Sequence, residues 1–176
     1  MIKKLVGKLF GFEKEILDLR QQVQELSWDS SFGMWTRGAF LQFCDIMPRG
    51  RRIVVFIDLD QVHDLNEELG YTEVDRRVKA TFSMPFRRSD VVARWYSGDE
   101  IVILFDTDRE GAERKISQLE KSAASQGMAF QFEVGEWEVG KTVIEDVVSV
   151  LADRLTQRKM ATSRAAWRRN LESSGS

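Results

Sequence analysis

The sequence is poor in cysteine and in net charge, and both scarcities narrow what the protein can do. Its single cysteine, Cys44, lies in an apolar stretch, so the chain can form no internal disulfide and is typical of a reducing cytosol. Acidic and basic side chains nearly cancel to a formal net charge of −2, so charge gives no reason to expect a nucleic-acid partner. We therefore expect a cytoplasmic protein, with Cys44 as a buried structural thiol and no nucleic acid bound.

Long hydrophobic runs are also lacking. A membrane-spanning helix needs roughly 18 or more consecutive apolar residues, and the N-terminal segment is interrupted by Lys3, Lys4, Gly7 and Lys8. We expect a soluble chain with no membrane partner. Its 176 residues are enough for one domain and a short extension.

The first segment has a heptad pattern. Apolar residues recur at alternating four- and three-residue steps, at Leu5, Leu9, Phe12, Ile16, Leu19, Val23 and Leu26. This spacing predicts a helical stalk that forms a homodimer through a coiled coil. The alternative is an amphipathic helix packed on its own domain, since Gly7 and Gly11 weaken the first turns by about 1 kcal/mol each. We assign residues 1–28 to the stalk, 29–170 to a folded domain and 171–176 to a disordered tail.

The remaining pattern predicts an α+β domain. Residues 52–58 form a continuous run rich in β-branched side chains, which is typical of a central strand buried on both faces. Residues 91–95 and 101–105 are predicted to pair as a β-hairpin, and a further strand is expected over residues 129–137. Helices are expected at residues 36–47, 62–69, 72–82, 110–125 and 143–160. This order favours a mostly antiparallel central sheet flanked by helices.

Carboxylates occur where the predicted strands end. Asp58 ends the central strand and Asp60 follows it, while Asp99 and Glu100 lie in the hairpin tip. If the hairpin pairs beside the central strand, Asp58 and Asp99 converge, and two close carboxylates repel unless a cation neutralises them. Mg²⁺ suits such a site because it prefers oxygen ligands and joins one or two carboxylates to substrate phosphates. The alternative interpretation is that these are solvated turn acids, and the spacing alone does not decide between the two.

Three blocks of the chain, in order, resemble the GGDEF family of diguanylate cyclases. Residues 97–101, Ser-Gly-Asp-Glu-Ile, look like the GGDEF signature, and residues 58–71 are similar to the family's D-x-D-x-F-K-x-I-N-D-x-x-G-H block. Residues 29–40 resemble the opening D-x-L-T-G-L-x-N-R-x-x-F, of which Asp29, Gly33, Arg37 and Phe40 remain. A weaker trace at residues 152–154 resembles the start of A-D-x-x-x-Y-x-x-K. The resemblance implies the palm-like nucleotide-cyclase fold and the condensation of two GTP into cyclic di-GMP with release of two pyrophosphates.

The resemblance also implies the roles of individual residues. Asp58 and Asp99 would hold Mg²⁺ (or Mn²⁺) together with the backbone carbonyl of Leu59, and Glu100 would contact or deprotonate the attacking ribose 3′-hydroxyl. Asn66 and Asp75 match the positions that hydrogen-bond guanine, which favours GTP over ATP. Further substrate contacts would come from Ser97, Gly98, His63, Lys159 and Arg164.

Regulation and assembly are implied in the same way. Arg87 and Asp90 fit the R-x-x-D motif that binds cyclic di-GMP at an inhibitory site in the family, although an ordinary solvated turn is the alternative. In the family each subunit of a homodimer holds one GTP, and each 3′-hydroxyl attacks the α-phosphate held by the other subunit. A heptad stalk would serve that assembly.

Several positions depart from the family pattern. Ser97 replaces the first glycine of the signature, and His63 stands where the family has a phosphate-facing lysine. Met160 aligns with another expected lysine, although Lys159 is adjacent. One extra residue between Arg94 and Ser97 predicts a bulge in the hairpin.

Three functions therefore fit the sequence. The first is an active diguanylate cyclase. The second is a catalytically silent GGDEF module that binds GTP or cyclic di-GMP and signals through its stalk. The third is a related cyclase that makes another cyclic dinucleotide, against which Asp75 is the main argument. The retained Asp58, Asp99, Glu100, Asn66 and Asp75 argue against the silent module, and the active diguanylate cyclase is the leading hypothesis.

Overall fold

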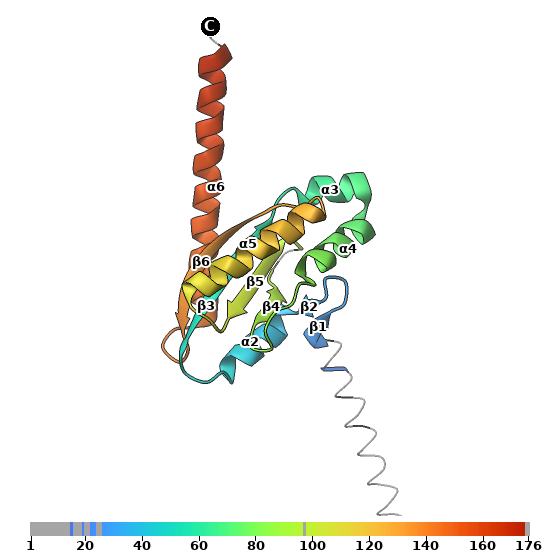
Figure 1. Ribbon diagram of the computed structural model, residues 1–176, viewed down its shortest axis with the longest axis vertical. Coiled ribbons are helices and arrows are strands. Elements are labelled where there is room, and N and C mark those ends of the chain that lie inside the picture. The colour runs from blue at the N-terminus through green and yellow to red at the C-terminus, as the bar shows by residue number, and fades with distance from the viewer. Residues whose placement is uncertain (1–14, 16–18, 20–21, 24–25, 97, 175–176) are drawn as a thin grey trace, which may run out of the picture.

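A single mixed sheet forms the centre of the fold. The computed structural model describes residues 15, 19, 22–23, 26–96 and 98–174. In this part of the chain the sheet has the order β1-β2-β4-β5-β3-β6. Its strands are β1 (Trp28–Asp29), β2 (Met34–Trp35), β3 (Arg51–Leu59), β4 (Val91–Arg94), β5 (Glu100–Phe105) and β6 (Phe130–Glu138). All neighbouring pairs are antiparallel except β2 and β4, which confirms the predicted mostly antiparallel α+β fold (Figure 1).

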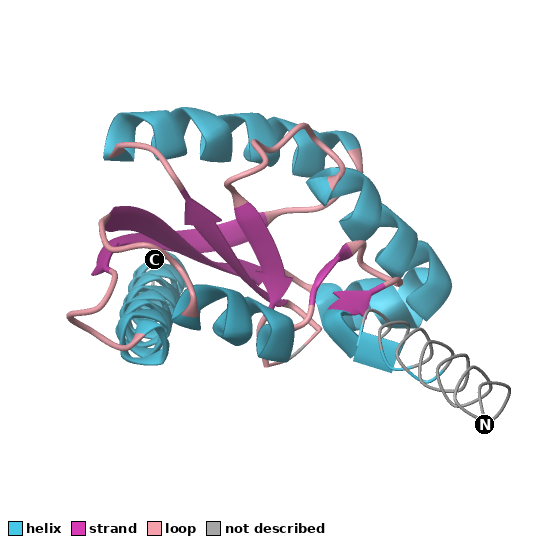
Figure 2. Ribbon diagram, turned by 90° about the horizontal axis from the view of Figure 1, so that it is seen from below, coloured by secondary structure: helices cyan, strands magenta, loops and turns pink. Residues whose placement is uncertain are grey.

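Helices cover both faces of the sheet (Figure 2). They are α2 (Arg37–Asp45), α3 (Val62–Leu69), α4 (Tyr71–Phe82), α5 (Arg109–Ser125) and α6 (Ile144–Ser174). Buried side chains of α4 and α5 share one core with the odd-numbered residues of β3, whereas α2 and α6 share a second core with the even-numbered Val54 and Phe56. Because side chains alternate along a strand, a strand covered on both faces must be apolar throughout. The run from Ile53 to Ile57 meets that requirement, so the predicted central strand is confirmed.

The hairpin of β4 and β5 pairs beside β3, as predicted. Its ladder runs without interruption from the pair Val91 and Leu104 to the pair Arg94 and Ile101. The predicted bulge is therefore not in this ladder, and the extra residue is accommodated in the turn. A turn tolerates an inserted residue more easily because it has no register to keep.

Three elements differ from the prediction. β1 and β2 were not predicted, since two-residue strands are too short for alternation to be visible. α6 continues to Ser174, past the predicted end at residue 160 and into the segment expected to be a disordered tail. Between Gly140 and Gly175 the sequence has neither glycine nor proline to end a helix. Cys44 is buried on α2, as expected.

The predicted stalk lies mostly outside the described residues. Its coiled-coil pairing and the domain boundary at residue 28 stay predictions. No helix in the described ranges has the length and apolarity that crossing a membrane requires.

Candidate active site

The carboxylates predicted to act together lie at one edge of the sheet. Asp58 on β3 is paired directly with Glu100 on β5, so their side chains lie on the same face, toward α6. The backbone amide of Leu59 donates to the carbonyl of Asp99 at 2.9 Å, which ties the end of β3 to the hairpin turn. The register of two antiparallel strands therefore brings Asp58, Leu59, Asp99 and Glu100 together.

Lys159 extends from α6 to this edge. Its Nζ lies 2.7 Å from Asp58 Oδ1 and 3.3 Å from Asp60 Oδ1, and Asp60 Oδ1 also accepts from Gln131 Nε2 at 3.1 Å. Burial by itself lowers the pKa of Lys159, but the hydrogen bond to Asp58 and the two negative charges outweigh it, so the pKa is raised. Lys159 is therefore an ammonium that neutralises part of the acidic edge.

Glu100 carries an unusual oxygen. Its Oε2 is buried and has no hydrogen-bond partner among the described residues. A buried acceptor without a donor costs free energy, roughly 1–3 kcal/mol. Such an oxygen is stabilised once a ligand brings a donor, for example a hydroxyl group, into reach.

A cavity of about 450 Å³ opens on the other side of the hairpin turn. Its lining includes Phe32, Asn66, Asp75, Gly98 and Asp99. Asn66 Oδ1 is also buried without a partner in the described part of the chain. The cavity thus combines an aromatic ring with two side-chain acceptors, a combination that suits a planar nucleobase whose edge presents N–H donors. We call it the base cavity.

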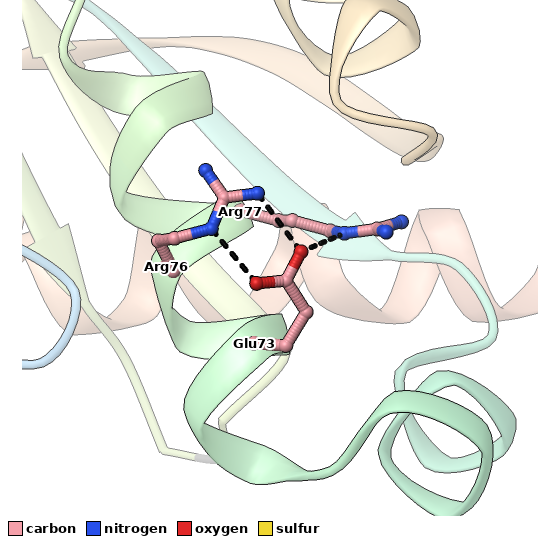
Figure 3. Close-up of polar contacts among 3 residues, drawn as sticks. All are labelled: Glu73, Arg76 and Arg77. Atoms are coloured by element: carbon pink, nitrogen blue, oxygen red, sulfur yellow. Dashed lines mark hydrogen bonds and ion pairs between the residues drawn. The ribbon is translucent and has the colours of Figure 1, made fainter.

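The two arginines that follow Asp75 on α4 hydrogen-bond to Glu73. Glu73 accepts from Arg76 Nε and Nη2, each at 2.8 Å, and from Arg77 Nε at 2.9 Å (Figure 3). These three residues are spaced i, i+3 and i+4 and so share one face of α4, whereas Asp75 lies on the cavity side. The hydrogen bonds from both arginines lower the pKa of Glu73 to about 2.

Arg94 connects the base cavity to the start of the domain. Its Nη1 lies 2.8 Å from Asp29 Oδ2, and its guanidinium lies over the ring of Phe32 with Cζ 4.6 Å from the ring centroid. A Cβ built on Gly98 would be only 3.3 Å from Arg94 Nη2, so a larger residue at position 98 would press on the guanidinium. Sequence reasoning kept Asp29 as a motif residue but did not identify Arg94 or Phe32 as lining the site.

The inserted turn residue has a defined place. Tyr96 is 72% exposed, and Arg37 Cζ lies 4.3 Å from the centroid of its ring and 4.8 Å from that of Trp95. Arg37 in turn pairs with Glu145 in the first turn of α6. This cation–π stack holds the hairpin tip against α2 and α6. The sequence analysis named Arg37 as a retained motif residue but did not predict the stack.

The remaining predicted substrate residues are less tightly placed. The His63 side chain is 83% exposed at the cavity rim, 3.4 Å from Glu67 Oε1. Ser97 and the side chain of Arg164 lie outside the described residues, so their contacts stay predictions. Met160, which aligns with the expected lysine, is 55% exposed, and the cation that reaches the site is Lys159.

The predicted inhibitory motif forms a closed turn beside a second cavity. Asp90 Oδ2 accepts from the backbone amide of Arg87 at 2.9 Å. A cavity of about 210 Å³ adjoins this turn, and its lining includes Arg87, Asp90, Arg114 and Lys115. Three cations around one cavity suit an anionic ligand.

The oxygen atoms at the acidic edge fit a Mg²⁺ ion that is bound jointly by the protein and the substrate phosphates. Within the described ranges no three His, Cys, Asp or Glu side chains are grouped to hold a metal ion by themselves. Mg²⁺ does not require such a cage, since it typically uses one or two carboxylates, waters and substrate phosphates. Asp58, Asp99 and the Leu59 carbonyl are oxygen donors of the required kind, and beside them lies Glu100 Oε2, which has no hydrogen-bond partner among the described residues.

Comparison with known proteins identifies the family of this chain. The profile of the family described as "Diguanylate cyclase, GGDEF domain" matches residues 45–162. A curated relative, cyclic di-GMP phosphodiesterase NbdA of Pseudomonas aeruginosa, is 33% identical over an alignment of 110 residues that covers 57% of this chain and 13% of NbdA. The chain therefore spans only about an eighth of that relative.

Solved structures share the fold. Diguanylate cyclase SiaD of Pseudomonas aeruginosa, in complex with its activator SiaC, superposes with a TM-score of 0.64 at 20% identity, covering 91% of this chain and 68% of SiaD. The coiled coil and GGDEF domain of DgcB from Caulobacter crescentus, in complex with c-di-GMP, gives a TM-score of 0.66 at 14% identity, covering 92% of this chain and 95% of the other.

Proposed function

This chain belongs to the GGDEF family, and we propose that it is a diguanylate cyclase, which condenses two GTP into cyclic di-GMP and two pyrophosphates. The observation that carries the proposal is the junction of two features at one hairpin turn. Asp58 and Glu100 lie on one side of the turn, the cavity with Asn66 and Asp75 lies on the other, and Asp99 in the turn itself lines that cavity. A nucleotide with its base in the cavity would place its sugar and phosphates at the acidic edge.

The base cavity supports the choice of guanine. The Asp75 carboxylate and the buried Asn66 Oδ1 are both acceptors. Guanine offers the N1–H and the 2-amino group as donors on one edge, whereas adenine lacks this pair. GTP therefore satisfies the acceptors, and ATP leaves them unpaired at a cost of roughly 1–3 kcal/mol for each buried group.

Glu100 supplies the base of the reaction. Its Oε2, which has no hydrogen-bond partner in the part of the chain that the structure describes, is suited to accept the proton of the ribose 3′-hydroxyl as that oxygen attacks. A bond then forms between the 3′-oxygen and the α-phosphorus of the second GTP, the bond from that phosphorus to the bridging oxygen breaks, and pyrophosphate leaves. Asp58, Asp99 and the Leu59 carbonyl would hold Mg²⁺ (or Mn²⁺), which when bound polarises the phosphate oxygens.

The described residues of one chain would hold one GTP, with its base in the cavity and its phosphates at the acidic edge, so the proposed reaction needs two chains face to face. The stalk over residues 1–28 would bring a second copy into place. Product feedback would use the smaller cavity at Arg87 and Asp90, whose cations suit a dinucleotide phosphate. Both remain parts of the proposal.

The decisive experiment is incubation of the purified protein with GTP and Mg²⁺, and separately with ATP, followed by chromatography and mass analysis. We expect cyclic di-GMP from GTP alone and none from Asp99→Ala. Asp75→Ser should broaden the choice of base, and an unchanged preference for GTP in that variant would contradict the guanine assignment. Absence of any dinucleotide from the wild-type protein would refute cyclase activity.

A second function is favoured by one observation, the ion pair between Lys159 and Asp58. A lysine on a metal-binding carboxylate is compatible with a catalytically silent module that binds GTP or cyclic di-GMP and signals through its stalk. Nucleotide binding measured by calorimetry without turnover would identify that module. Cyclic di-GMP formed in the Asp99-dependent assay would exclude it.

A further inference from the structure

We propose that Lys159 competes with the divalent cation for Asp58. The ammonium is paired with Asp58 until the metal displaces it, and it thereby lowers the affinity of the site for the metal. The inference rests on the proposed function, since it concerns the same acidic edge. It assigns Lys159 a role before the nucleotide binds, in addition to the substrate contact expected from the sequence.

The ammonium lies where a metal ion would have to bind. Lys159 Nζ is 2.7 Å from Asp58 Oδ1 and 3.3 Å from Asp60 Oδ1, so it bridges two carboxylates. All three side chains are only 28% to 29% exposed, so water screens the contact less than at an open surface. A divalent cation on the same Asp58 oxygen would lie within a few ångströms of a like charge, and the two cannot share it.

The helix backbone keeps Lys159 aimed at this edge. Its neighbour Arg158 donates from Nη2 to the carbonyl of Phe132 at 2.6 Å and pairs through Nη1 with Glu133 at 2.9 Å. One turn earlier, Leu155 is buried in the core between α6 and the sheet. Residues four apart share a helix face, so α6 presents Lys159 to β3 whenever Leu155 is packed.

Metal binding must therefore break an existing ion pair. The long side chain of Lys159 can then swing away from Asp58, and a triphosphate at the same edge would offer it a new partner. Lys159 would thus lower the metal affinity of the protein without nucleotide. It would no longer do so when the metal binds together with a nucleotide. For a partly buried pair we expect a penalty of about 3- to 10-fold in metal affinity, which corresponds to roughly 0.7–1.4 kcal/mol.

The test is Mn²⁺ affinity in the absence of nucleotide, measured from the electron paramagnetic resonance signal of free Mn²⁺. Lys159→Met should bind Mn²⁺ about 3- to 10-fold more tightly than the wild-type protein, and Lys159→Gln should behave alike. Arg154→Met is the matched control, because it removes one positive charge from an exposed position of the same helix. Asp58→Asn should abolish the tight binding in each background.

Several outcomes would overturn the inference. These are an unchanged or weaker Mn²⁺ affinity in both Lys159 variants, an equal gain in Arg154→Met, or no Mn²⁺ binding in any variant. Unfolding curves of the Lys159 variants establish that they are folded. Tighter Mn²⁺ binding in a protein that makes no cyclic di-GMP would refute the cyclase and uphold the competition, whereas cyclic di-GMP synthesis with unchanged Mn²⁺ affinity would do the reverse.

Discussion

Replacing Asn66 with alanine should make the empty protein more stable and its complex with GTP weaker. Asn66 Oδ1 is buried at the cavity wall without a hydrogen-bond partner in the described part of the chain. An unpaired buried acceptor costs roughly 1–3 kcal/mol, and alanine also favours the helical conformation of α3 by up to about 0.7 kcal/mol. Some packing is lost with the side chain, so we expect a net gain of about 1 kcal/mol.

The two effects can be measured on the same samples. A gain of about 1 kcal/mol raises the melting temperature of a domain of this size by about 2–4 °C. Loss of one neutral hydrogen bond, about 0.5–1.5 kcal/mol, weakens GTP binding by roughly 2- to 12-fold. Calorimetric unfolding without nucleotide gives the first quantity, and titration with a non-reacting GTP analogue gives the second.

The control for Asn66→Ala is Glu68→Ala, an exposed position on the same helix, which should change neither quantity appreciably. A lower melting temperature for Asn66→Ala would mean that the amide is a structural hydrogen-bonding group. Unchanged affinity for the GTP analogue would mean that the Asn66 oxygen does not face the base. Either result refutes the reasoning that this oxygen is kept unpaired for a ligand.

Three further predictions concern the scaffold. Burial raises the pKa of Asp29, but hydrogen bonds from Arg94 and two backbone amides hold it below its ordinary value. Asp29 should therefore stabilise the fold at neutral pH, and this contribution should disappear as the pH falls from about 4 through the lowered folded pKa. Urea unfolding at pH 7 and pH 3 should show less pH dependence for Asp29→Asn, and an equal dependence would count against the pair. Leu151→Ala removes a fully buried side chain that packs against Gly135 of β6, so it should lower the free energy of unfolding by about 2–5 kcal/mol in the same assay, and a loss under 1 kcal/mol would disagree. Burial, together with the charge of Asp45, raises the pKa of the Cys44 thiol to about 12, so Ellman's reagent at pH 8 should label it only after unfolding; rapid labelling of the native protein would contradict this.

Much of the fold could be predicted from the sequence because its strongest signals are local. An uninterrupted β-branched run can be accommodated only between two layers, and Ile53 to Ile57 has that position. The hairpin followed from two apolar runs around a short polar turn. The weak points of the prediction were the short β1 and β2, which lack periodicity, and the end of α6, which no glycine or proline marks.

The candidate site divides in the same way. Asp58, Asp99 and Glu100 could be named because they lie where predicted strands end or in the turn between them. Asn66 and Asp75 could be named only because they match positions of the family that the chain resembles. Their grouping around one turn depends on the register between β3 and β5, which pairs Asp58 with Glu100. Contacts between residues far apart in the sequence could not be predicted, because they leave no local pattern. Arg94 and Asp29, which hydrogen-bond beside the cavity, are 65 positions apart.

The sequence by itself determined the types of side chain at the site, the α+β order of elements and the family to which they belong. Only the tertiary structure decided which cation reaches the acidic edge. Lys159 and Met160 are adjacent in the sequence, but successive residues of an α-helix point about 100° apart. The packing of Leu155 orients α6 so that Lys159 contacts Asp58 and Met160 is left at the surface.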